Sequence, residues 1–406
     1  MLTVGQIEAA DRLRGEGRFR NTPLHFPASL NRRLARNGRI YLKLELFQRT
    51  GSFKVRGATA KVLSLSKKER ACGIIAASAG NHAQGVALAA SAIGVSARIV
   101  MPEYASLTKR EATAGYGAKV ILKGATYDEA YAHALELRDA DGGTLIHAFD
   151  DELVMAGQGT IGLEILRDLP DVETVICPVG GGGLISGLAT ALKARRPQTK
   201  IVGVQAEGAD SAVASFRAKR RVSTDEVATI ADGIKVQRVG ERCFEIIGKL
   251  VDEMITVSDA QICRAMLLLD EHAHISAEPA GATAIAALLN GPMPPPRGPS
   301  VVLVSGGNID TFEKTRYIRR ALIEERRHHH VRVRLIDRRG SKPREMSKLF
   351  QLLGEHELNV LDIAHHRDTP NVPLGLVEVE LLLETRGAAH ARAITDALAG
   401  AGFDLV

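Results

Sequence analysis

Long apolar runs are missing from this sequence of 406 residues. No stretch approaches the roughly 18 apolar residues that a membrane-spanning helix requires. The first residues, MLTVGQIEAADRLRGEG, lack a basic stretch followed by an apolar core, so we expect no secretory signal. Only four cysteines are present and none forms a C-x-x-C pair, which disfavours a disulfide framework and a zinc site. We therefore expect buried thiols in a cytoplasmic protein that binds no membrane.

The sequence has little net charge outside one segment. Its formal charge is +6, and residues 314–344 hold 12 lysines and arginines against three acidic residues. Tyr317 is the only aromatic residue there, so the segment lacks the stacking platform of single-strand nucleic-acid binders. We interpret it as a solvated helix and linker that binds no nucleic acid; a salt-sensitive nucleic-acid stripe is the alternative. The histidines at 328–330 are expected to lie solvated in this linker and to bind no metal.

Short apolar segments alternate with helical ones, which predicts an α/β fold. The expected strands are continuously apolar, as is typical of parallel sheets covered on both faces. The pattern restarts after about residue 150, so we expect two parallel-sheet α/β lobes with a cleft between them. The expected strands are Ala71–Ala77, Ala97–Met101, Ala118–Leu122, Thr174–Cys177, Ile201–Gln205, Met254–Val257 and Ser300–Val304.

The sequence changes character after about residue 330. Val331–Ile336 alternates apolar and charged residues, which predicts a half-exposed strand. A helix, two strands, a second helix and a short last strand over 403–406 are expected to follow. This order of elements is typical of a ferredoxin-like module.

One lysine stands in an apolar setting, within TGSFKVRG at residues 50–57. Lys54 lies between Phe53 and Val55, and apolar surroundings would lower its pKa and make its amine a nucleophile toward a carbonyl carbon. The alternative is a surface lysine whose aliphatic stem packs on an apolar patch. On this segment alone, the surface lysine is the better interpretation.

Two glycine-containing segments each follow an expected strand and open a helix, where open α/β sheets bind ligands. The turn Ser78-Ala79-Gly80-Asn81-His82 would direct backbone N–H groups at an anion such as a carboxylate, although Ser78 and Asn81 are also good helix caps. The four glycines 180–183 predict a phosphate cradle, with a flexible hinge as the alternative. They match neither the dinucleotide fingerprint nor the nucleotide P-loop.

A fourth segment, Ser305-Gly306-Gly307-Asn308, follows the strand expected at 300–304. The hydroxyl of Ser305 would lie at that strand's carboxyl end and could meet a ring nitrogen; a tight turn is the alternative. A lysine that can form an imine, a phosphate cradle and a carboxylate-binding turn are together what a pyridoxal phosphate enzyme acting on amino acids requires.

The motifs SFKVRGA (52–58), SAGNHAQGVA (78–87), GGGGL (180–184), IADGI (230–234) and SGGN (305–308) resemble, in this order, the threonine ammonia-lyase (threonine dehydratase) family of fold-type-II pyridoxal phosphate enzymes. The resemblance implies that Lys54 holds the cofactor covalently, that Phe53 lies near its ring and that Ser305 faces its pyridine nitrogen. It assigns the cofactor's phenolic oxygen to Asn81, the substrate carboxylate to Ser78, Asn81 and His82, and the phosphate to Gly180, Gly181, Gly182, Gly183 and Leu184.

The resemblance covers about residues 20–325. It implies a catalytic domain at 1–325, with a small lobe at about 48–149 inserted in the large lobe. Length and order resemble the medium-length form of the family, which implies one ACT-like regulatory domain at 331–406. ACT modules typically bind amino acids between paired copies, so an amino-acid effector and a homodimer or homotetramer are implied.

The implied reaction is the dehydration and deamination of L-threonine to 2-oxobutanoate and ammonia, and of L-serine to pyruvate. Ala79 stands where serine racemases carry a second serine, which favours elimination over racemisation. Other β-hydroxy amino acids such as 3-hydroxyaspartate, a racemase, and a non-catalytic amino-acid sensor remain alternatives. Some relatives bind a divalent metal; Glu207 fits its first ligand, but Val213 stands where an aspartate is expected and Asp210 has the wrong spacing, so we predict no metal. Glu278 is a further candidate contact for the substrate or a cation.

Overall fold

The computed structural model describes the chain except residues 36–37, 290–292, 337–343, 368–369 and 371. The chain divides into two compact units, Met1–Lys314 and Thr315–Val406. The division falls inside helix α14 (Thr311–Glu324), about ten residues before the end predicted for the catalytic domain. The domains at 1–325 and 331–406 and the lobe at 48–149 stay predictions.

The larger sheet of the first unit has six strands in the order β1-β2-β10-β7-β8-β9. Every neighbouring pair is parallel except β1 and β2, which are antiparallel. All six residues of β10 are buried, as expected for a strand covered on both faces. The strands are β1 (Leu24–His25), β2 (Arg39–Leu44), β7 (Thr174–Pro178), β8 (Lys200–Ala206), β9 (Glu253–Val257) and β10 (Pro299–Val304).

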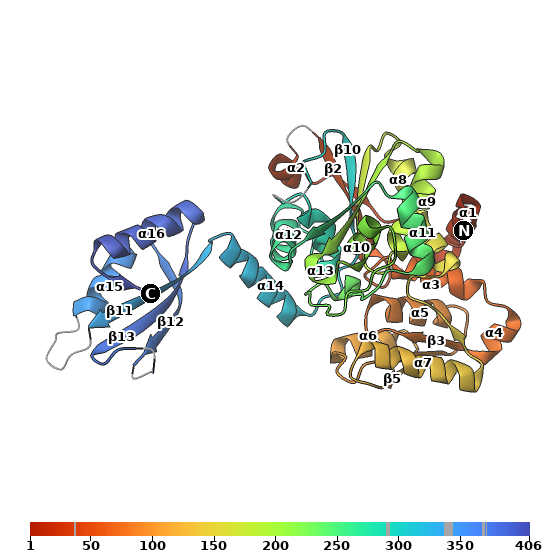
Figure 1. Cartoon of the computed structure of the whole chain (residues 1–406), viewed down its shortest axis with the longest axis horizontal. Helices are drawn as coiled ribbons and strands as arrows, with labels where there is room; N and C mark the ends of the chain where they lie inside the picture. Colours follow the sequence, from red (N-terminus) through yellow and green to blue (C-terminus); the bar gives the residue numbers. More distant parts are fainter. Residues whose placement is uncertain (36–37, 290–292, 337–343, 368–369, 371) are drawn as a thin grey trace. The chain divides into compact units, whose positions relative to one another are not determined.

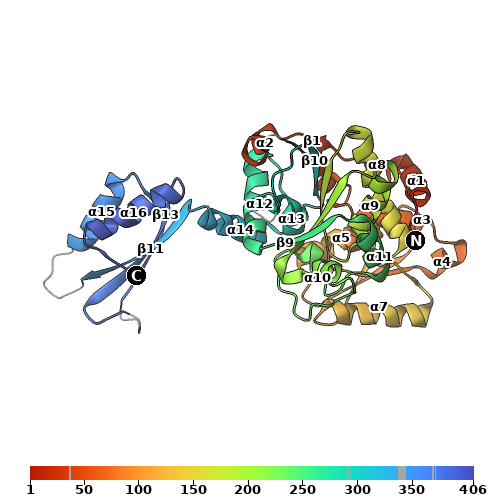
Figure 2. The same ribbon diagram turned by 45° about the horizontal axis from the view of Figure 1, so that its top comes forward.

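Helices cover both faces of this sheet (Figures 1 and 2). Val175 and Cys177 of β7 belong to one apolar core with residues of α8 and α9, and Ile176 points to the other face because side chains alternate along a strand. On that face α13 packs against β10, β7 and β8. The helices of the large sheet are α1 (Val4–Arg12), α2 (Ala28–Leu34), α8 (Glu152–Asp168), α9 (Gly183–Arg195), α10 (Ser211–Ala218), α11 (Glu241–Leu250), α12 (Asp259–His272) and α13 (Pro279–Ala286).

The smaller sheet has four parallel strands in the order β5-β4-β3-β6. Ile74 and Ala76 of β3 pack in one core with α5, whereas Ile75 and Ala77 pack with Ala130 and other residues of α7. The two helices therefore cover opposite faces, as Figure 1 shows. The elements are β3 (Ile74–Ala77), β4 (Ala97–Met101), β5 (Lys119–Leu122), β6 (Thr144–Leu145), α3 (Lys54–Leu63), α4 (Lys67–Cys72), α5 (Asn81–Ser91), α6 (Leu107–Gly115) and α7 (Tyr127–Asp141).

The prediction of parallel-sheet lobes is confirmed, but two details near residue 72 are wrong. The strand expected from Ala71 begins only at Ile74, because helix α4 occupies the preceding residues and is started by a capping box between Ser66 and Glu69. Cys72, the last residue of that helix, is exposed, whereas the other three cysteines are buried as expected.

After the end of α14, the described residues of the second unit form a four-stranded antiparallel sheet in the order β12-β13-β11-β14. Helices α15 and α16 follow β11 and β13 in the chain order β-α-β-β-α-β. Val331, Val333 and Leu335 alternate into its core. The histidines 328–330 are not in a solvated linker: they begin β11 and pair with β13. The elements are β11 (His328–Ile336), α15 (Arg344–Glu355), β12 (Asn359–His366), β13 (Leu376–Glu384), α16 (Ala388–Gly400) and β14 (Asp404–Leu405). Among the described residues, no helix has the length and apolar character to cross a membrane.

Candidate active site

Three of the predicted site segments lie at the carboxyl ends of parallel strands. The turn of Ser78 follows β3, the glycine loop follows β7, and Ser305 follows β10. Two of these segments also open helices, since α5 begins at Asn81 and α9 begins at Gly183. This is the sheet edge at which open α/β folds bind ligands.

Lys54 is the first residue of α3. Its Nζ donates a hydrogen bond to the carbonyl oxygen of Ala148 at 2.9 Å and lies 5.2 Å from the centre of the Phe53 ring. Burial lowers the pKa of the Lys54 ammonium to about 8, although the nearby Cys243 and Glu278 act in the opposite direction. A substantial fraction of the amine is therefore neutral, and nucleophilic, slightly above neutral pH.

The glycine loop is tightly packed, and side chains would not fit on it. A Cβ on Gly181 would lie 2.5 Å from ring carbons of Phe149, and one on Gly182 would lie 2.8 Å from the Cβ of Cys243. Gly182 also has a φ of +97°, which favours glycine. This close packing speaks against the flexible hinge considered as an alternative.

The backbone N–H groups of this loop are free of partners within the described part of the chain. None of the N–H groups from Gly180 to Leu184 donates a hydrogen bond to another described residue, and the loop is buried except for its half-buried first glycine. Buried donors without partners are rare, and at a helix N-terminus they form a ready site for an anion. The loop therefore fits the phosphate of pyridoxal phosphate.

The turn before α5 offers a second set of free donors. Ser78 Oγ accepts the N–H of Gly80 at 3.1 Å, whereas the N–H groups of Asn81, His82 and Ala83 have no partner among the described residues. The imidazole of His82 points elsewhere: its Nε2 lies 2.9 Å from the carbonyl oxygen of Ile146, and burial lowers its pKa to about 3. His82 thus offers an anion its backbone N–H, since its ring is neutral and already bonded.

A chain of side-chain hydrogen bonds crosses the site. Asn81 Nδ2 donates to Glu278 Oε1 at 2.7 Å, and Asn308 Nδ2 donates to Asn81 Oδ1 at 2.7 Å. Burial raises the pKa of the Glu278 carboxyl to about 7. Sequence reasoning named Glu278 only as a candidate contact and gave Asn308 no role, although the SGGN motif contained it.

Ser305 joins the lysine segment to this chain of hydrogen bonds. Its backbone carbonyl accepts the N–H of Phe53 at 3.1 Å, and Ser52 and Gly306 form an isolated β-bridge. The Ser305 hydroxyl is buried and lies 3.4 Å from the carbonyl oxygen of Ala280. Ser52 Oγ is buried without a partner among the described residues. The structure thus brings the five predicted motifs together. Lys54 bonds Ala148, the neighbour of Phe149, and Phe149 and Cys243 pack against the glycine loop. A Cβ on Gly180 would lie 2.9 Å from Cα of Ile234 in the IADGI motif.

A buried ion network behind Lys54 was not predicted. Arg56 lies on the same helix, and its guanidinium bonds Glu45 and Glu164 at 2.8 Å each. Lys43 Nζ also reaches Glu164, at 2.7 Å. All four side chains are fully buried. The network fixes helix α3 to β2, to the turn after it and to α8.

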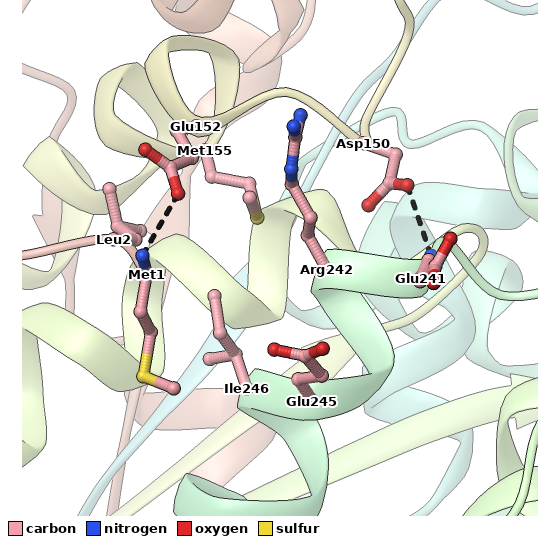
Figure 3. Close-up of a pocket in the computed structure, with 9 residues that line it drawn as sticks. All are labelled: Met1, Leu2, Asp150, Glu152, Met155, Glu241, Arg242, Glu245 and Ile246. Atoms are coloured by element: carbon pink, nitrogen blue, oxygen red, sulfur yellow. Dashed lines mark hydrogen bonds and ion pairs between the residues drawn. The ribbon is translucent and has the colours of Figure 1, made fainter.

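A pocket of about 430 Å³ lies beside α11 (Figure 3). Asp150 lines it and accepts the N–H groups of Glu241 and Cys243 at 3.0 and 3.2 Å. The pocket contains none of the predicted site residues, so we do not assign it to the active site. Asp210, considered above as a metal ligand, instead accepts the hydroxyl of Thr224 at 3.2 Å, and the described residues contain no group of three or more side chains arranged to hold a metal.

Comparison with known proteins agrees with this geometry. A family model described as pyridoxal-phosphate dependent enzyme matches residues 16–306. The chain is 43% identical over 406 residues to L-threonine ammonia-lyase of Thermotoga maritima, covering 100% of this chain and 99% of the relative. It is 41% identical over 396 residues to L-threonine ammonia-lyase of Geobacter sulfurreducens, covering 98% and 96%.

Solved structures extend the comparison to the fold. Processed threonine deaminase isoform 2 from Solanum lycopersicum superposes with a TM-score of 0.74 and 38% identity, over 80% of this chain and 91% of that one. The predicted fold-type-II architecture is confirmed by this likeness and by the two parallel sheets. The lysine, the two sets of free N–H groups and the matched family model lead to one conclusion: the chain belongs to the pyridoxal-phosphate dependent enzymes.

Proposed function

We propose that this protein is a threonine ammonia-lyase, which converts L-threonine to 2-oxobutanoate and ammonia and L-serine to pyruvate and ammonia. One observation carries the proposal: an amine with a pKa of about 8 lies in one site with two separate sets of free backbone N–H groups. One set suits a phosphate and the other a carboxylate. The names of the two full-length relatives support threonine as the substrate.

The chain's residues divide the work of binding. Lys54 would hold the cofactor through its Nζ, the N–H groups of residues 180–184 would bind the phosphate, and Phe53 would contact the ring. Asn81 would contact the phenolic oxygen, and Ser305 would contact the pyridine nitrogen. Pyridoxal phosphate, when bound, supplies an electron sink for the substrate's α-carbon.

Proton movement falls to the same lysine. Lys54 Nζ would take the α-proton of the bound substrate, which its lowered pKa permits because a neutral amine is available. The N–H groups of Asn81 and His82 hold the substrate carboxylate, and the hydroxyl of Ser78 orders the turn through Gly80. Ala79 supplies no acid or base on the second face of the substrate, which favours elimination.

The second unit is proposed to be an ACT-like regulatory domain at 331–406. Its β-α-β-β-α-β order supports the proposal. An amino-acid effector such as a branched-chain amino acid would bind there, in a cytoplasmic homodimer or homotetramer that serves isoleucine biosynthesis. Light scattering with and without isoleucine or valine tests assembly and effector binding together.

The test of the catalytic proposal is product analysis. Purified protein incubated with L-threonine should form 2-oxobutanoate and ammonia in equal amounts, and Lys54→Ala should abolish both. Lys67→Ala, on the exposed start of α4, is the matched control and should keep full activity. If L-threonine and L-serine both fail while 3-hydroxyaspartate is consumed, the substrate assignment is wrong.

A further inference from the structure

The orientation of the Asn81 amide is determined by its surroundings. An asparagine amide has a donor end and an acceptor end that can be exchanged by a half-turn, and only hydrogen-bond partners decide between them. Asn308 Nδ2 lies 2.6 Å from the carbonyl oxygen of Thr50, which can only accept, so the nitrogen of Asn308 is placed without ambiguity. The same nitrogen lies 2.7 Å from the Asn81 amide, whose end facing Asn308 must therefore be the oxygen.

The opposite end of Asn81 is then its nitrogen, and Glu278 Oε1 accepts one of its two hydrogens at 2.7 Å. Glu278 is buried and can approach because residue 306 is a glycine: a Cβ there would lie 2.2 Å from that carboxyl oxygen. Gly51 provides space for Asn308 in the same way, since a Cβ on Gly51 would lie 2.2 Å from Asn308 Oδ1. Gly51 also has a φ of +70°, which favours glycine. Gly306 of the SGGN motif and Gly51, directly before the SFKVRGA motif, thus make room for the two partners of Asn81.

The second Nδ2 hydrogen of Asn81 has no partner among the described residues. The Nδ2 end of Asn81, opposite the end held by Asn308, therefore has one free donor. We infer that Glu278 and Asn308 are positioning residues, which lock the Asn81 amide so that it presents an N–H to the bound cofactor. This inference rests on the proposed contact between Asn81 and the phenolic oxygen, and it explains why that oxygen would be favoured in its ionised form.

Absorption spectra of the holoenzyme test the inference, because the bound cofactor has separate bands for an ionised and a protonated phenolic oxygen. Glu278→Met removes the acceptor, and Asn308→Asp removes the donor, so they release the amide from opposite ends. In either folded variant we expect the band of the protonated oxygen to grow and cofactor binding to weaken about tenfold. Glu278→Gln can still offer Oε1 to Asn81 and should keep the wild-type balance of bands, which a purely electrostatic role of Glu278 would not allow.

Asn31→Asp is the matched control for losing a buried asparagine. Asn31 bonds the backbone of Pro27 and Ile40 at the amino end of β2, on the edge of the sheet opposite the active site. The Asn31→Asp variant should be less stable than the wild type but should leave the bands of the ionised and the protonated phenolic oxygen unchanged. Wild-type spectra in both Glu278→Met and Asn308→Asp would overturn the inference, as would a change in Glu278→Gln as large as that in Glu278→Met. Asn81→Ala tests the proposed contact with the phenolic oxygen separately from the positioning of the amide. An unchanged spectrum of Asn81→Ala refutes that contact.

Discussion

Removing Arg56 should destabilise the first unit more than any loss of a surface arginine. Arg56 and Lys43 face Glu45 and Glu164, so the buried network is neutral overall, with all four side chains shielded from water. Glu164 keeps a lowered pKa, despite its burial, because Arg56 and Lys43 lie against it. Arg56→Met leaves one negative charge without a fully buried partner in this interior, since Arg14, 3.9 Å from Glu164, is partly exposed.

Breaking a buried ion pair on one side costs about 3–5 kcal/mol. With a urea dependence of about 3 kcal/mol per molar, the unfolding midpoint should fall by about 1–1.7 M. The full-length holoenzyme is unfolded in urea at a fixed cofactor concentration, and the absorbance of the bound cofactor reports the unit that carries Lys54. Arg39→Met is the control, because the ion pair of Arg39 with Asp171 is largely exposed and should contribute at most about 1 kcal/mol.

A second variant tests the cause. Glu45→Gln combined with Arg56→Met restores neutrality, so the double variant should be more stable than Arg56→Met alone. Equal midpoints for Arg56→Met and Arg39→Met would refute the reasoning. So would a double variant that is the sum of two independent losses, because the cost would then come from lost packing and not from an unpaired charge.

Three further outcomes are expected. Gly182→Ala should weaken cofactor binding at least about tenfold in a titration, because Gly182 has a positive φ and an added Cβ would clash with Cys243. Gly248→Ala is the control, since a Cβ there would meet no atom within 4 Å, and it should keep the wild-type affinity. Equal affinities of the two variants would contradict the packing argument. The rate at which cofactor-free protein recombines with pyridoxal phosphate should rise with pH and level off above about pH 8, since neutral Lys54 is the nucleophile. A midpoint of the pH profile near the ordinary lysine pKa of 10.5 would contradict the lowered pKa of Lys54. In cofactor-free protein, the stability that Glu278 contributes is fully present below pH 4.5 and is lost as pH rises through about 7, a decline of about 3 kcal/mol. Glu278→Gln should abolish this decline when the free energies of unfolding at pH 5 and pH 8 are compared. An equally steep decline in the variant would disprove the role of Glu278.

Local signals in the sequence were enough to predict most elements of the two sheets. Ala97–Met101 was predicted at its observed bounds, because this short, mostly apolar segment ends directly before a proline. The glycine loop was predicted before a helix because a strand, a glycine run and an apolar helix follow one another in sequence. Elements that lack such contrast were not predicted, such as β2, whose six residues include Arg39 and Lys43.

The contacts that complete the site could not be predicted, because they join distant parts of the chain. Asn81 meets Glu278 and Asn308 across about 200 residues, and Arg56 meets Glu164 across about 100. A buried arginine next to the reactive lysine looks like a surface charge in the sequence, since burial depends on partners that the local pattern does not contain. The histidines 328–330 are a similar case: they were expected in a solvated linker, but pairing with β13 places them in a strand despite their polar character.

The most direct test of the central claim locates the cofactor on the chain. Holoenzyme is treated with borohydride, which reduces an imine to a stable amine, and is then digested for peptide mass analysis. The account predicts that the added pyridoxal phosphate mass lies on the peptide containing Lys54 and that Lys54→Ala yields no labelled peptide. A label on another lysine, or an unlabelled chain from a protein that still consumes L-threonine, would contradict it.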